Sequence, residues 1–108
     1  MLEIVTPKQF SEHVDHGVGL VLVEFYADFC GPCKLVHPIF YQSAAALASK
    51  ANFVRVDCSH FEKEYLSTLN VRLLPTCQAY RDGKFTEEFV GARPSEFAAW
   101  LKKVAFRK

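Results

Sequence analysis

Apolar and polar residues alternate along the chain in blocks that have the lengths of strands and helices. Residues 2–5 form a short apolar run, and residues 20–27 are apolar on both faces of a strand, which is typical of a central strand covered by helices on either side. A third run covers residues 52–57. Two further β-rich runs flank Asp82 and Gly83, a strong signal for a β-hairpin. The pattern therefore predicts five strands.

Helical segments fill the intervals between these strands. The first helix is predicted to begin at a capping box in which Thr6 is the N-cap, Pro7 the first helical residue and Gln9 the reciprocal partner. Apolar residues at helical spacing predict a second helix from residue 32 to about residue 49. We expect this helix to bend at Pro38, because proline has no backbone hydrogen to donate.

Two more helices complete the pattern. Ser59 and Glu62 have the spacing of a capping box and predict a third helix after them. Residues 93–106 predict a final amphipathic helix, whose apolar stripe consists of Phe97, Trp100, Leu101 and Val104. The element order βαβαβαββα predicts an α/β fold in which a central mixed five-stranded sheet is flanked by four helices. We expect residues 1–108 to form a single domain, because this length provides one hydrophobic core.

Composition excludes several classes of function. Half of the residues are apolar, 23% are charged and the net charge is +1, which is ordinary for a folded globular domain. Because basic residues form no long run or stripe, we expect no binding to nucleic acid. No apolar stretch is long enough for a membrane helix, so we expect no membrane partner. The first ten residues do not resemble a secretory signal, and the expected location is the cytoplasm.

The main candidate for chemistry is a pair of cysteines that follows the central strand directly. Cys30 lies at the junction between this strand and the second helix, and Gly31 and Pro32 make the turn. The free amides and the positive dipole end at the start of a helix stabilise an anion, so Cys30 is expected to ionise readily. Cys33 lies one turn further on, within reach of a disulfide but more shielded. This placement favours an attacking role for Cys30 and a resolving role for Cys33.

Two other interpretations of the pair are weaker. A zinc site needs two further ligands, and although Cys58, Cys77 and His37 are present, no second pair has the usual spacing. We therefore expect no metal. A purely structural disulfide between neighbouring turns would constrain few residues of the unfolded chain and would add little stability. Thiol–disulfide exchange is the favoured interpretation.

Five separate pieces of the chain resemble the thioredoxin family in sequence, order and spacing. They are VLVEFYAD, the motif FCGPCK, LLPT, DGK and FVGARP, and together they span essentially the whole chain. The resemblance implies a thioredoxin fold and a protein dithiol–disulfide oxidoreductase that reduces disulfides in target proteins. It implies no bound cofactor, since the redox-active disulfide is part of the chain. Its expected partners are disulfide-containing proteins and a flavoprotein thioredoxin reductase that draws electrons from NADPH, and we expect a monomer.

The resemblance also implies roles for individual residues. Cys30 would form the mixed disulfide with the substrate and Cys33 would break it. Pro75 would be a cis-proline facing the cysteines, and the backbone of Leu74 would pair with an extended substrate segment. A flat apolar rim for docking of partner proteins would be completed by Phe29, Gly31, Pro32 and Gly91.

Glu24 is the single charged residue in the apolar central strand. An ionised carboxylate buried there without a partner would be very costly. Thioredoxins usually have Asp at the matching position, and the resemblance implies that this acid moves a proton to or from the buried cysteine through water. Glu24 is one methylene longer, so two readings stay open: a catalytic proton carrier, or a side chain that reaches solvent or pairs with Arg55.

Two alternative functions remain at this point. The segment VEFYA looks more like protein disulfide isomerase domains, although Pro32 occupies the position before the second cysteine, where such isomerases typically have His. A thioredoxin-like binding module without turnover is the other alternative, but the intact Cys30 and Cys33 argue against it.

The remaining candidates lie outside the cysteine motif. Cys58 and Cys77 are most simply interpreted as small buried apolar residues, with a regulatory second disulfide or a cross-linked dimer as the alternative. His37 lies one turn after Cys33 and either influences the thiols electrostatically or faces solvent beside Pro38.

Overall fold

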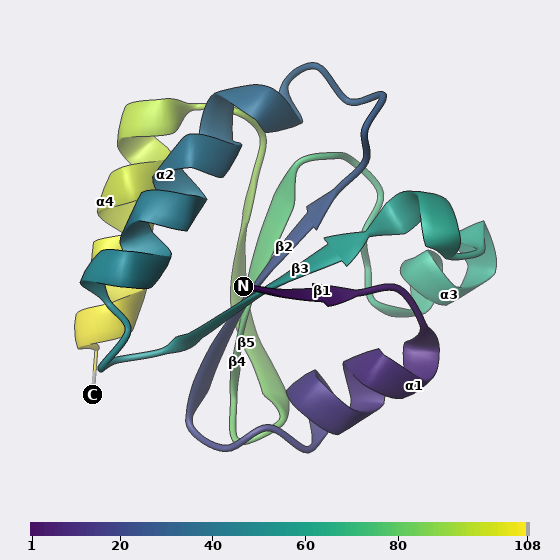
Figure 1. Ribbon diagram of the computed structural model, residues 1–108, viewed down its shortest axis with the longest axis horizontal. Helices are drawn as coiled ribbons and strands as arrows, with labels where there is room; N and C mark the ends of the chain where they lie inside the picture. Colours follow the sequence, from purple (N-terminus) through teal and green to yellow (C-terminus); the bar gives the residue numbers. More distant parts are fainter. Residues whose placement is uncertain (108) are drawn as a thin grey trace.

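A computed structural model describes residues 1–107 and shows a mixed sheet between two pairs of helices (Figure 1). The strand order is β1-β3-β2-β4-β5. The first three of these run parallel, while β4 is antiparallel to β2 and to β5. This confirms the predicted five-stranded mixed sheet with the second strand at its centre. The strands are β1 Leu2–Ile4, β2 Leu20–Tyr26, β3 Asn52–Asp57, β4 Thr76–Arg81 and β5 Lys84–Val90.

The four predicted helices cover both faces of the sheet. They are α1 Pro7–Phe10, α2 Cys33–Ala46, α3 Lys63–Thr68 and α4 Pro94–Phe106. In Figure 1, α2 and α4 lie together on one side of the sheet, and α1 and α3 lie on the other. No helix within residues 1–107 is long and apolar enough to span a membrane.

Every residue of β2 is buried, as the two-sided apolar pattern predicts. Leu22 belongs to the core on the α2 and α4 side, together with Phe40, Phe97 and Leu101. Val21, Val23 and Phe25 belong to the other core. Each such side chain contributes about 1.5–3 kcal/mol by leaving water. The two cores hold β2 rigidly from both sides, and so fix the place where it ends, next to the cysteines.

The helix ends are partly as predicted. The capping box of α1 is confirmed, since Thr6 Oγ1 accepts a hydrogen bond from the Gln9 amide at 3.1 Å and Gln9 Oε1 accepts one from the Thr6 amide at 3.2 Å. A π-helical segment, Ser11–Asp15, continues α1. The α-helical part of α2 ends at Ala46 and not near residue 49.

The predicted capping box at Ser59 and Glu62 is wrong. The Ser59 hydroxyl donates to Asp57 Oδ1 at 2.7 Å, and the Ser59 amide donates to the same oxygen at 3.1 Å. Asp57 therefore caps a short 3₁₀ turn, Cys58–His60, and α3 begins later, at Lys63. The Asp57 carboxylate thus accepts from the Ser59 amide, the donor that the Glu62 side chain would bind in a capping box.

The hairpin between β4 and β5 turns at Asp82 and Gly83, as predicted. Their φ angles are +50° and +84°, the left-handed conformation that this type of turn requires. A Cβ on Gly83 would lie 2.0 Å from the backbone oxygen of Asp15, so only glycine fits there. Asp82 Oδ1 also accepts a hydrogen bond from the Gly19 amide at 2.8 Å.

Candidate active site

Cys30 and Cys33 form a disulfide at the junction between β2 and α2. Their Cα atoms are 5.4 Å apart. The backbone amide of Cys33, the first residue of α2, donates a hydrogen bond to the sulfur of Cys30 at 3.2 Å. An amide and the positive end of a helix dipole directed at a sulfur atom favour its thiolate form. The geometry therefore gives Cys30 the environment of a nucleophile.

Local backbone bonds shape the loop that carries Cys30. The Cys30 amide donates to the oxygen of Ala27 at 3.0 Å, which closes a turn after β2. The Lys34 amide then donates to Gly31 and begins the helical pattern of bonds. Pro32 has a φ of −58°, a value that proline favours and that leads into α2. The sequence Gly-Pro thus makes a short, stiff connection from strand to helix.

Several predicted site residues lie at the same end of the sheet as this disulfide. The Leu74–Pro75 peptide bond is cis, as the family resemblance implies. Leu74 packs against the small cluster of Tyr26, Ala27 and the two cysteines. The Gly91 amide donates to the Pro75 oxygen at 2.9 Å, and Gly91 has a φ of +106°. The structure thereby brings the segment around Pro75 and the turn at Gly91 to the same end of the sheet.

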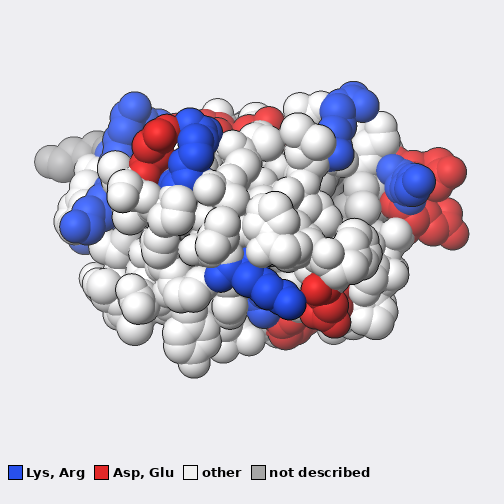
Figure 2. Space-filling model, turned by 90° about the horizontal axis from the view of Figure 1, so that it is seen from above, with Lys and Arg blue, Asp and Glu red and all other residues white. Residues whose placement is uncertain are grey.

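The surface at this end is mostly uncharged. The β2–α2 loop lies at the top of Figure 1, and Figure 2, which looks down on that end, shows a broad region without charged side chains and with charges mainly at its margins. Phe29 is 82% exposed, and Gly31 and Pro32 are exposed as well. A large apolar side chain left in water next to a redox-active disulfide is typical of a surface that contacts other proteins.

A cleft of about 630 Å³ adjoins the loop on the α3 side. Phe29 and Leu74 form part of its wall, so it is continuous with the surroundings of the disulfide. The other lining residues are Cys58, Ser59, Phe61, Lys63, Leu66, Ser67, Val71 and Arg72. The cleft combines apolar walls with two cationic side chains.

Glu24 lies near the end of β2, the strand that leads to Cys30, and is buried, with only 1% of its surface exposed. Arg55 Nε donates to Glu24 Oε1 at 2.7 Å, so the pairing considered from the sequence is present. The carboxylate of Glu24 does not reach solvent. Nδ1 of His37 lies 3.0 Å from the same oxygen, a contact that sequence reasoning missed. The available signal was the four-residue spacing from Cys33, which places both side chains on one face of α2.

The charged pair at Glu24 is part of a row across three strands. Glu3, Arg55 and Glu24 are register partners on β1, β3 and β2. The guanidinium of Arg55 lies 3.6 Å from the ring centre of Tyr26, whose hydroxyl donates a hydrogen bond to Glu3. Burial and this bond to Glu3 raise the pKa of Tyr26. Alternating charges and a stacked ring hold Arg55 in place beside Glu24.

The second carboxylate oxygen of Glu24 has different surroundings. Among residues 1–107, Oε2 has no hydrogen-bond partner. Glu24 also lines a small cavity, together with Pro75, Cys77 and Gly91, of about 10 Å³. Such a volume is at the lower limit of the room that one water molecule needs. Glu24 thus reaches from Arg55 and His37 on one side to the vicinity of the cis-proline on the other.

Cys58 and Cys77 are free thiols, and both are buried. They belong to the cores on opposite faces of the sheet. Burial, with a smaller contribution from Asp57, raises the pKa of Cys58 to about 12. Burial and the charge of Glu24 raise the pKa of Cys77 well above its ordinary value. Both environments agree with the interpretation of these residues as core side chains.

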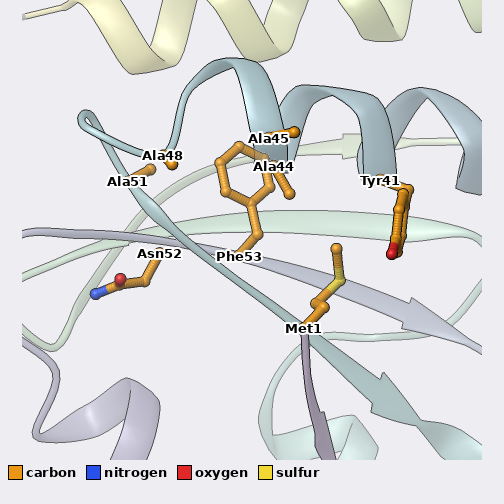
Figure 3. A pocket seen from close by; sticks show the side chains of 8 residues that line it. All are labelled: Met1, Tyr41, Ala44, Ala45, Ala48, Ala51, Asn52 and Phe53. Carbon is orange, nitrogen blue, oxygen red and sulfur yellow. The ribbon is translucent and has the colours of Figure 1, made fainter.

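Another hollow, of about 370 Å³, lies between the C-terminal half of α2 and the start of β3 (Figure 3). Its wall carries no cysteine, histidine, acid or base, and none of its residues belongs to the surroundings of the disulfide. The lining consists of Met1, Tyr41, Ala44, Ala45, Ala48, Ala51, Asn52 and Phe53. It offers no chemistry of its own. Within the described part of the chain, no cluster of His, Cys, Asp or Glu could hold a metal ion.

Comparison with known proteins places this site in a family. The family model named Thioredoxin matches residues 1–103. A thioredoxin of Aspergillus fumigatus is 36% identical over 101 residues, which cover 93% of this chain and 91% of that protein. A second relative, thioredoxin 1 of Plasmodium falciparum, is 30% identical over 97% of this chain and 99% of its own length. The chain therefore belongs to the thioredoxin family.

Solved structures agree with this assignment. A thioredoxin of Chlamydomonas reinhardtii superposes with a TM-score of 0.84 at 28% identity, covering 100% of this chain and 99% of that one. A Plasmodium falciparum thioredoxin gives a TM-score of 0.85 at 25% identity and covers 95% of this chain and 98% of its own. Family membership and the Cys30–Cys33 pair identify a thiol–disulfide oxidoreductase with disulfide reductase activity.

Proposed function

We propose that the chain transfers two electrons from its Cys30–Cys33 dithiol to disulfides in target proteins. The Cys30 thiolate attacks one substrate sulfur, a mixed disulfide forms, and the first substrate thiolate leaves. Cys33 then loses its proton and attacks the Cys30 sulfur, which closes the Cys30–Cys33 disulfide and releases the second substrate thiolate. The observation that carries this assignment is the hydrogen bond from the Cys33 amide to the Cys30 sulfur at the start of α2.

Glu24 is the proposed acceptor of the proton that Cys33 loses. It is a buried acid, and it lies on the strand that leads to Cys30. A carboxylate fixed by Arg55 on one oxygen keeps the other oxygen free for proton transfer, through water where the distance requires it. The same path in reverse protonates Cys33 when the disulfide is reduced again.

The uncharged end of the sheet is the proposed docking surface for substrates. The backbone of Leu74, before the cis-proline Pro75, has its place next to the disulfide and can pair with an extended segment of the partner. Phe29, Gly31 and Gly91 extend this surface, with Pro32 in the loop itself. Phe29 supplies the largest exposed apolar group of these residues.

The dithiol must be regenerated after each turnover. We infer that a flavoprotein thioredoxin reductase, which draws on NADPH, supplies the two electrons, so that the chain needs no bound cofactor of its own. A reducing compartment supports this cycle, and the cytoplasm is the proposed location. The charge of +1 without a basic stripe supports action on proteins and not on nucleic acids. We propose that the monomer is the active form.

Insulin reduction driven by dithiothreitol tests the assignment of Cys30. We expect Cys30→Ser to lower the rate to the level without protein, a loss of at least about a thousandfold, because no other cysteine has a comparable environment. Cys33→Ser is the complementary variant. In this variant Cys30 can still attack the substrate disulfide, but no thiol at position 33 can release the substrate. A mixed disulfide with the substrate should therefore accumulate and be detected by mass spectrometry.

Circular dichroism on both variants verifies that they are folded. Insulin precipitation by Cys30→Ser at the wild-type rate would contradict the proposed function. It would instead favour a binding module in which the cysteines do not turn over.

A further inference from the structure

His37 joins the buried acid to the surface. Its Nδ1 lies 3.0 Å from Glu24 Oε1, while 33% of its side chain is exposed to solvent. The Glu24 side chain, in contrast, is only 2% exposed. His37 also lines a cleft of about 240 Å³ whose wall includes Cys33 and Arg55. The imidazole therefore touches the carboxylate on one side and the solvent on the other.

A proton carrier that is closed off from water needs a route for its proton. If Glu24 takes the proton of Cys33 in one half of the cycle, this proton must leave before the next turnover. Of the two groups bonded to Oε1, Arg55 keeps its protons under all ordinary conditions. Imidazole both takes up and releases protons in the neutral range, at two separate nitrogen atoms. His37 is thus the group in contact with Glu24 that has the right chemistry for this route.

We propose that His37 carries protons between solvent and Glu24 during thiol–disulfide exchange, an inference that rests on the proposed role of Glu24. When Cys33 attacks the mixed disulfide, its proton passes to the Glu24 carboxylate. Rotation of the carboxyl group about its Cγ–Cδ bond turns the protonated oxygen towards His37, the acid gives its proton to Nδ1, and the ring releases the proton on Nε2 to water. In the reverse direction the ring takes a proton at Nε2 and delivers one at Nδ1. His37 does not touch the sulfur atoms, so it is a positioning residue that acts through Glu24.

Charged groups of both signs and an aromatic ring surround the imidazole of His37. The ring of Tyr41 packs edge-on at 6.0 Å between centres. The charged and titratable groups that face His37 or share its cleft are Glu24, Tyr26 and Asp28 from β2 and its loop, Arg55 from β3, and Lys34 and Tyr41 from α2.

Stopped-flow reaction of the reduced protein with 5,5′-dithiobis(2-nitrobenzoate) separates the two steps. The attack of Cys30 releases the first thionitrobenzoate and the attack of Cys33 releases the second. In His37→Asn the amide nitrogen can keep the hydrogen bond to Glu24 but cannot relay a proton. We expect the second release to slow by at least about tenfold in dilute buffer near neutral pH, with the first release changed less than about twofold.

Rescue by a small base distinguishes proton transfer from a structural effect. His37→Ala leaves space beside Glu24, and added imidazole should restore the second release in a concentration-dependent manner. His60→Asn is the matched control, because His60 is a partly exposed histidine that pairs with Asp57 at 3.5 Å and not with Glu24. It should react as the wild type does, with no response to imidazole.

Glu24→Gln separates failure of this inference from failure of the proposed function. If this variant slows the second release across pH 6 to 9 but both His37 variants match the wild type, the inference about His37 is overturned and the role of Glu24 stands. An absence of imidazole rescue in His37→Ala would also overturn it. If Glu24→Gln itself releases the second product at the wild-type rate, the proton role of Glu24 is refuted together with that of His37.

Discussion

The four cysteines occupy two contrasting regions, although all of them are buried to a similar degree. Cys30 and Cys33, at the junction of β2 and α2, are 8% and 4% exposed. Cys58 and Cys77, in the cores on the two faces of the sheet, are 7% and 3% exposed. The exposed fraction therefore does not separate the redox-active pair from the inert thiols. Burial raises the pKa of Cys58 and Cys77, and the groups that each sulfur atom meets contribute further to the difference.

At the junction, a backbone amide donates to the sulfur of Cys30, and charge on that sulfur is stabilised. In the core, the geometry is reversed for Cys58, whose Sγ lies 3.8 Å from the carbonyl oxygen of Val56 and acts as the donor. A hydrogen-bond acceptor beside a thiol stabilises the protonated form of the thiol. At equal exposure, the amide at the start of α2 therefore favours the thiolate of Cys30, whereas burial, the largest cause of the raised pKa of Cys58, and the carbonyl of Val56 favour the protonated thiol.

Alkylation of the reduced protein with iodoacetamide at pH 7 is expected to show the largest contrast. A thiol with a pKa of about 12 is ionised to roughly one part in a hundred thousand at this pH, whereas an ordinary thiol is ionised to about three parts in a hundred. Cys30 should therefore react at least about a thousandfold faster than Cys58, and Cys77 should be similarly slow. Peptide mass spectrometry at successive times measures the individual rates.

Unfolding in guanidinium chloride is the control for this measurement, because all four cysteines should then react at similar rates. Modification of Cys58 or Cys77 in the native protein within tenfold of the rate of Cys30 would show that the two regions do not differ as described.

Much of the fold that surrounds the two regions could be predicted from the sequence, because it depends on signals between residues close in sequence. The capping box at Thr6 and the turn at Asp82 and Gly83 involve residues close in sequence, and both are confirmed. The two-sided apolar pattern of β2 also placed Cys30 at the end of a central strand. The cis bond at Pro75 followed from the family resemblance, since no local signal distinguishes it.

The features that could not be predicted depend on how separate elements meet. The contact of His37 with Glu24 requires the rotation of α2 over the sheet, which helical periodicity alone leaves open within a residue or two. The bond from Tyr26 to Glu3 requires the register of β1 against β3. At Ser59 the sequence contains the motif, but the Ser59 amide donates to Asp57 Oδ1 and not to the Glu62 side chain. Which of two neighbouring acceptors takes this amide is decided by geometry that the sequence motif does not contain.

The pH dependence of folding stability should provide a second test of the comparison. At alkaline pH the buried thiols keep their protons only while the protein is folded. A folded pKa above the unfolded value gives stability that is present below the unfolded pKa and lost as the pH rises towards the folded one. For Cys58 this window runs from 9.0 to about 12. Each such thiol lowers the free energy of unfolding by up to about 1.4 kcal/mol per pH unit in the window.

Urea unfolding of the oxidised protein between pH 7 and pH 10.5 measures this loss. The double variant with Cys58→Ala and Cys77→Ala should lose less stability above pH 9 than the wild type, whatever its stability at pH 7. Tyr26 and Tyr80, whose pKa values are also raised by burial, titrate in both proteins and cancel in the difference. Parallel stability curves for the two proteins would mean that the buried thiols ionise as freely as in the unfolded chain.

The smallest expected effect concerns the exposed apolar surface beside Cys30. Phe29 is 82% exposed beside Cys30, whereas both free thiols are buried. Loss of part of an aromatic contact with a protein substrate costs about 1 kcal/mol, so Phe29→Ala should lower kcat/KM for insulin by about fivefold. The reaction with a small aromatic disulfide should change less than twofold, because the reagent needs no docking surface. Phe106→Ala, at a 60% exposed phenylalanine near the end of α4, is the matched control and should leave both rates unchanged. Equal losses of rate with insulin and with the small disulfide would show that Phe29 affects the cysteine loop itself and not the recognition of the protein substrate.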